Sequence, residues 1–71
     1  MIRAVFEKTL VRAGAVRSFQ IHAGPSGWEV SEQNDQTVAR HHHADWHHVE
    51  RTLTRFEDQI ATLRSEGWRE S

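Results

Sequence analysis

The chain contains no cysteine among its 71 residues, which excludes disulfide bonds and every thiolate metal ligand. It also lacks any apolar run near the roughly 18 residues that a membrane-spanning helix requires. Glu7, Lys8 and Arg12 interrupt the N-terminal segment, where a secretory signal would have an unbroken apolar stretch. These absences predict a cytoplasmic protein that has no membrane segment.

An excess of charge of either sign is missing as well. Nine Lys and Arg residues stand against ten Asp and Glu residues, giving a net charge of -1 at pH 7. Because nucleic-acid binding usually shows a basic excess, this balance does not favour a nucleic-acid partner or a membrane surface. A chain this short buries only roughly 60% of the surface that its unfolded form exposes. We therefore expect a single domain over residues 1–71 that gains stability by forming a homodimer.

Apolar residues in the C-terminal half recur at helical spacing. Intervals of 3, 4, 3, 4 and 3 residues separate the members of one stripe: Trp46, Val49, Leu53, Phe56, Ile60 and Leu63. This pattern is typical of an amphipathic helix. Asp45 is a suitable N-cap, and Gly67 suits the left-handed residue that ends many helices. The sequence predicts a helix over about residues 46–66, with Trp68 folding back after it.

Turn signals divide the N-terminal half into four segments. The sequences RAGAV, GPSG and QNDQ each contain residues that favour tight turns. If each closes an antiparallel hairpin, the first two registers place Ile21 between Phe6 and Val30. The strands are then expected over residues 3–12, 15–23, 28–33 and 36–43.

The last hairpin is predicted to close with a two-residue loop at residues 34–35. This register places Trp28 opposite His41. On the other side of the sheet it aligns three side chains across neighbouring strands: His22, Glu29 and Arg40. Opposite charges in such a row stabilise a sheet by about 0.2–1 kcal/mol per pair, so a structural role explains them.

The three registers agree on one apolar face of the sheet. Its members are Ala4, Phe6, Leu10, Phe19, Ile21, Ala23, Trp28, Val30 and Ala39. A slip of one residue would break this face, because successive side chains alternate between the two sides. The predicted fold is α+β: a four-stranded antiparallel meander followed by one C-terminal helix packed on one face of the sheet. A helix over residues 2–13 that ends at Gly14 is the alternative for the first segment.

Five of the six histidines lie in the stretch HHHADWHH, residues 41–48. Neutral imidazole binds zinc, nickel and copper, so these residues are candidates for a zinc or nickel site. His41 and His43 share one face of the predicted strand, and His47 follows in the first helical turn. A polar junction between strand and helix is the preferred explanation of the cluster, and histidine charge changes near neutral pH suggest proton sensing as a third interpretation.

Four valines are predicted on the face of the sheet that the helix leaves uncovered: Val5, Val11, Val16 and Val38. Apolar groups on a sheet surface indicate a partner, and a second copy of a small chain is the natural one. We therefore take these valines as interface candidates, with the apolar stripe of the helix as the alternative surface.

The predicted function is that of a non-enzymatic, self-associating protein-interaction module. His48 and Asp45 are close in sequence, but capping explains the carboxylate and no nucleophile accompanies them. A meander followed by a helix resembles the arrangement of single-strand-binding domains of the Whirly type, which implies single-stranded nucleic-acid binding as an alternative. Its stacking platforms would be aromatic side chains that are assigned to the core here. Transition-metal binding by the histidines is the other alternative.

Overall fold

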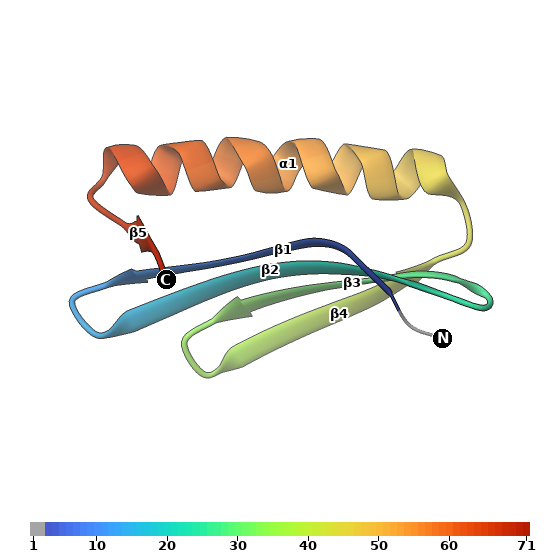
Figure 1. The fold of residues 1–71 in the computed structure, drawn as a ribbon, viewed down its shortest axis with the longest axis horizontal. Coiled ribbons are helices and arrows are strands. Elements are labelled where there is room, and N and C mark those ends of the chain that lie inside the picture. The colour runs from blue at the N-terminus through green and yellow to red at the C-terminus, as the bar shows by residue number, and fades with distance from the viewer. Residues whose placement is uncertain (1–2) are drawn as a thin grey trace.

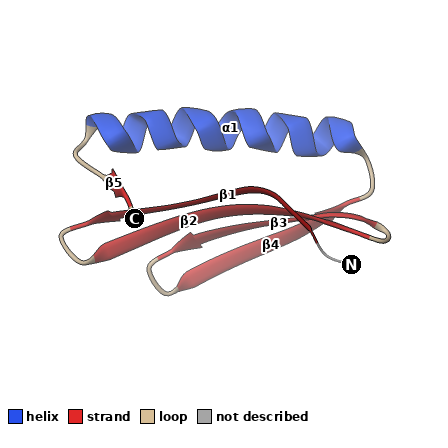
Figure 2. Ribbon diagram, viewed as in Figure 1, coloured by secondary structure: helices blue, strands red, loops and turns tan. Residues whose placement is uncertain are grey.

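The computed structural model describes residues 3–71 as a sheet covered on one side by a helix. The helix α1 runs along the strands, and both layers are seen edge-on in Figures 1 and 2. The predicted order of four strands and a helix is confirmed, and the first segment is a strand rather than a helix. Residue 2, where the alternative helix over residues 2–13 would begin, lies outside the described residues. The elements are β1 (Arg3–Arg12), β2 (Ala15–Gly24), β3 (Gly27–Asn34), β4 (Thr37–His43), α1 (Trp46–Ser65) and β5 (Arg69–Glu70).

The strands form one antiparallel sheet in the order β4-β3-β2-β1-β5. Ile21 lies opposite both Phe6 and Val30, as the pattern predicts. The first hairpin turns at Ala13 and Gly14, which have φ values of 49° and 84°. Two successive left-handed residues match the twist of the flanking strands, so this short loop fixes the register.

The beginning of β1 departs from the predicted register. Ala4 lies opposite His22 and not opposite Ala23, because the register shifts between Ala4 and Phe6. Such a bulge puts one extra residue into one strand and bends it locally. The alternation of apolar residues contains no sign of this insertion.

The last hairpin is also displaced from its predicted register. Its loop begins at Asp35, one residue later than expected, so Trp28 lies opposite His43 and not opposite His41. Asp35 has a left-handed φ of 52° and bonds twice to Val16: its N–H donates to the carbonyl at 2.9 Å, and its carboxylate accepts from the N–H at 3.0 Å. These long-range bonds select the loop. The pairing shifts by two residues, so the side chains of β4 keep their predicted faces.

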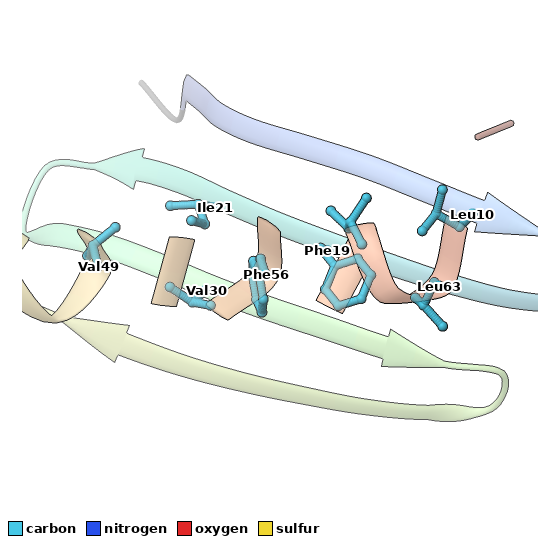
Figure 3. Close-up of a cluster of buried hydrophobic side chains, with 8 residues drawn as sticks. Leu10, Phe19, Ile21, Val30, Val49, Phe56 and Leu63 are labelled. Carbon is cyan, nitrogen blue, oxygen red and sulfur yellow. The ribbon is translucent and has the colours of Figure 1, made fainter. Parts of the chain in front are cut away.

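The core lies between α1 and the strands β1, β2 and β3. Phe56 is fully buried at its centre, with ring centroids 5.0 Å from Phe19 and 6.3 Å from Phe6. Figure 3 shows the helical side chains directed between those of the strands. Among the described residues, no member of this core comes from β4, and Ala39 is exposed. The buried side chains are Leu10, Phe19, Ile21, Val30, Val49, Phe56, Ile60 and Leu63.

Both predicted helix ends are confirmed. The Asp45 carboxylate accepts a hydrogen bond of 2.9 Å from the N–H of His47. Gly67 has a φ of 99°, and the next N–H, that of Trp68, donates to the Leu63 carbonyl at 3.0 Å. Trp68 thereby folds back against the core. Within residues 3–71, no helix is both long and apolar enough to cross a membrane.

The strand β5 is held to the sheet by an ion-pair network that the sequence pattern did not indicate. The Glu70 carboxylate accepts from the Lys8 ammonium at 2.7 Å and from the Arg64 guanidinium at 2.6 Å. The hydrogen bond from Lys8 is the main reason why the pKa of Glu70 lies below its ordinary value of 4.5. This network explains how Lys8, on the apolar side of β1, finds a partner.

Replacing Glu70 with glutamine is expected to lower the melting temperature at pH 7. A carboxyl whose folded-state pKa is lowered stabilises the protein above its unfolded-state value, and this contribution disappears as the pH falls through the folded-state value. The difference in melting temperature between wild type and E70Q should therefore be present at pH 7 and should disappear as the pH falls below 4.5. Circular dichroism melts over this range measure it, with Glu57→Gln on the exposed side of α1 as the control. An equal gap at all pH values would contradict the prediction.

Candidate protein-interaction surface

The two long edges of the sheet differ in how they are covered. Along β1, Leu10 and Val11 pair with β5, and the Ser71 N–H donates to the Thr9 carbonyl at 2.9 Å. The bulge near Ala4 bends the remaining part of that strand. Pairing and bulging are two of the ways in which natural sheets prevent unwanted strand addition. The β1 edge is therefore protected at both of its ends, by β5 near residues 9–11 and by the bulge near residues 4–6.

The opposite edge is β4, and it carries none of these protections within residues 3–71. Its sequence, TVARHHH, contains no proline or lysine, and its register against β3 is continuous. Every residue of β4 is exposed except His43, which is half-buried. No buried core side chain of the described residues comes from β4, which forms the outer edge of the sheet in Figure 1. We call this strand the β4 edge.

Hydrogen-bond alternation identifies the backbone groups that the β4 edge presents. Asn34 and Thr37 close a two-residue loop, and such a closing pair exchanges both of its hydrogen bonds. Alternate residues from Thr37 onward therefore bond to β3. The residues between them direct both N–H and C=O away from the sheet: Val38, Arg40 and His42. Three consecutive donor–acceptor sets are thus available to an added strand.

The structure separates the three histidines that were predicted as metal ligands. His41 is exposed on the helix side of β4, and His47 is exposed in the first turn of α1. His43 stacks instead on His48, with ring centroids 5.7 Å apart and planes inclined by 18°. No three His, Cys, Asp or Glu side chains among the described residues are grouped so as to hold a metal ion. Zinc or nickel binding stays a prediction without a formed ligand set.

The side of the sheet away from α1 has a shallow hollow of about 400 Å³ near the turn between β2 and β3. Across its floor, Glu29 lies between His22 and His42 on the neighbouring strands. The shifted hairpin places His42 where the sequence predicted Arg40. The His22 ring nitrogen is 3.8 Å from a Glu7 carboxylate oxygen, and the His42 ring faces the turn. These groups are cross-strand neighbours on an open surface, and a role in stabilising the sheet explains them.

The four candidate interface valines do not form one continuous patch. Val11 and Val16 lie opposite each other beside the first turn. Val5 is 43% exposed at the bulge, about 20 Å along β1 from Val11 at the usual rise per residue. Val38 is 49% exposed and stands on the β4 edge. Only Val38 therefore joins the surface that the backbone leaves open.

Comparison with protein-family models, curated proteins and solved structures gives no match. The surface that sequence reasoning missed is the β4 edge. One signal for it was present, because a meander always places its first and last strands at the sheet edges. Which of those two edges stays open depends on the position of β5, and two residues are too few to predict a strand.

Proposed function

We propose that this protein is a non-enzymatic interaction module that self-associates through the β4 edge. The observation that carries the proposal is the contrast between the two edges: β1 is paired and bulged, whereas β4 presents an uninterrupted row of main-chain donors and acceptors. Strand addition to such an edge gives affinity through main-chain hydrogen bonds, and side chains on alternate faces give specificity.

Charge and size both support a second copy as the partner. A net charge of -1 produces little repulsion between two copies. A domain of 71 residues gains stability when association buries further surface. Association at β4 also leaves the core intact, because the buried side chains come from the other strands and α1.

Single-stranded nucleic-acid binding has less support from the placement of the aromatic rings. Phe19 is fully buried, and Phe6 and Trp28 pack against the core. Bases stack on exposed aromatic faces, so these rings do not provide the platform that such binding uses.

Native mass spectrometry of the untagged protein tests the proposal. The chain has a mass of 8.3 kDa, and we expect a species of twice that mass which grows with concentration through the micromolar range. A protein that stays monomeric at high micromolar concentration would contradict the proposal. Fluorescence anisotropy with a labelled oligonucleotide at low salt checks the nucleic-acid alternative in parallel.

A further inference from the structure

We infer that the β4 edge pairs antiparallel with β4 of a second copy, with Ala39 on the two-fold axis. This inference rests on the proposed function and specifies its contact. The dimer would contain one continuous sheet that crosses both copies, with both helices on the same side. The core side chains of α1 pack against β1, β2 and β3, so the inferred contact at the outer side of β4 leaves the core unchanged.

Symmetry limits the registers that two β4 strands can adopt. In an antiparallel pair, residues directly opposite each other point to the same face of the sheet. Outward backbone groups must also meet outward groups, so Val38, Arg40 and His42 can lie opposite only one another. Both conditions place the two-fold axis on a residue and never between residues. The possible centres are the interior residues of β4.

Side-chain charge excludes one of these centres, and two others leave Val38 without a partner in the strand. An axis at Arg40 places two guanidinium groups directly opposite each other, and like charges in that position destabilise a sheet. An axis at His41 places Arg40 opposite the partner's His42 and leaves Val38 opposite a position outside β4. An axis at His42 places that imidazole opposite itself. Of the outward-facing residues, only His42 then lies within the contact, because Arg40 and Val38 face positions outside β4.

An axis at Val38 gives a contact as short as the axis at His42, because only residues 37–39 then face one another within β4. An axis at Ala39 brings the smallest side chain of β4 against itself, where two strands approach most closely. It places Arg40 opposite the partner's Val38, so the aliphatic stem of arginine covers an exposed valine. Each such pair exchanges two main-chain hydrogen bonds, giving about four in the contact.

The helix side of β4 fits the same register. Thr37 lies opposite the partner's His41, and both side chains are exposed in the single copy. A threonine hydroxyl and an imidazole can exchange a hydrogen bond across neighbouring strands. The Ala39 centre is thus the register in which charge, size and hydrogen bonding agree.

The absence of native cysteine allows the register to be read by single cysteine substitutions. At a centre where residues face themselves without a hydrogen bond, the Cα atoms are about 4.5 Å apart, which is within disulfide range. Under mild oxidation, Ala39→Cys should form covalent dimer at least about tenfold faster than His41→Cys, Arg40→Cys or Val38→Cys. Glu57→Cys, on the exposed side of α1, gives the rate of random collision.

Each outcome of this scan decides something. Fastest cross-linking at His41, Arg40 or Val38 would overturn the Ala39 register. Cross-linking of every β4 variant at the Glu57→Cys rate would overturn pairing through β4 altogether. If the wild-type protein is dimeric by mass in that case, self-association survives and only the interface assignment fails; a monomeric wild type removes both.

Arg40→Pro supplies a second test, because proline removes the N–H that the inferred contact needs. That N–H points away from β3, so the fold keeps its hydrogen bonds. Arg40→Ala is the matched control, since it removes the charge and retains the N–H. We expect R40P to be monomeric with an unchanged far-ultraviolet spectrum, and R40A to remain dimeric. A folded R40P that dimerises like wild type contradicts the inference, and if R40P does not fold, the cysteine scan decides.

Discussion

Replacing Phe56 with alanine is expected to lower the free energy of unfolding by about 3–5 kcal/mol, the cost of truncating a fully buried phenylalanine. Phe56 comes from the middle of α1 and contacts Phe19 and Phe6, which belong to different strands. Its removal leaves a cavity where one ring of the helix contacts both β1 and β2. A domain of this size has little stability in reserve. We therefore expect F56A to be largely unfolded at 37 °C.

Urea unfolding followed by circular dichroism measures this loss. The matched control is Leu53→Ala, one turn earlier on α1, where the side chain is only half-buried and packs at the margin of the core. Its expected cost is about half as large, because burial determines the transfer and cavity terms. Protein concentration has to be equal in all samples, since association stabilises the folded state. A loss below about 1 kcal/mol for F56A would show that the core is placed wrongly.

Local patterns predicted those parts of the fold that depend on neighbouring residues. The spacing of Val49, Phe56 and Ile60 identified the buried side of α1, and Asp45 identified its start. The alternation around Ile21 gave the register of the first three strands. A one-residue error there would have turned an apolar side chain to water, so the pattern had a strong physical constraint.

Contacts between distant residues determined what the sequence did not predict. The register of the last hairpin is fixed by the hydrogen bonds between Asp35 and Val16. These two residues are far apart in the chain, because Val16 precedes β3 and Asp35 follows it. A shift of two residues keeps every side chain on its face, so alternation could not detect the error. The bulge at Ala4 and the docking of β5 through Glu70 likewise depend on tertiary contacts.

The candidate site was missed for a related reason. Side-chain composition drew attention to the histidines and the surface valines, whereas the strongest feature of the surface is made of backbone groups. Val38 belongs to both sets, because its side chain is exposed and its N–H and C=O face outward. Recognising the β4 edge requires knowledge of which strands are covered, and this depends on the placement of α1 and β5.

Replacing Gly27 with alanine is expected to destabilise the protein by about 2–4 kcal/mol. Gly27 has a φ of 136°, which side-chain-bearing residues rarely adopt. A Cβ atom there would lie 2.5 Å from the His43 carbonyl oxygen and 3.1 Å from the Ala44 Cα. Both are backbone atoms, so the clash has no rotamer that relieves it. The strand β3 would have to move away from the end of β4.

Gly24 provides the matched control for this substitution, because it lies directly opposite Gly27 in the same hairpin. A Cβ at Gly24 would meet only the Gly27 carbonyl oxygen, at an ordinary contact distance of 3.9 Å. Its replacement by alanine should change stability by less than about 1 kcal/mol. Thermal melts of both variants compare the two positions, and equal losses would mean that β3 and β4 are not as close at this end as described. The strain in G27A is local to His43, so a folded fraction of this variant should still cross-link through a cysteine at position 39, because the inferred axis lies four residues away from His43.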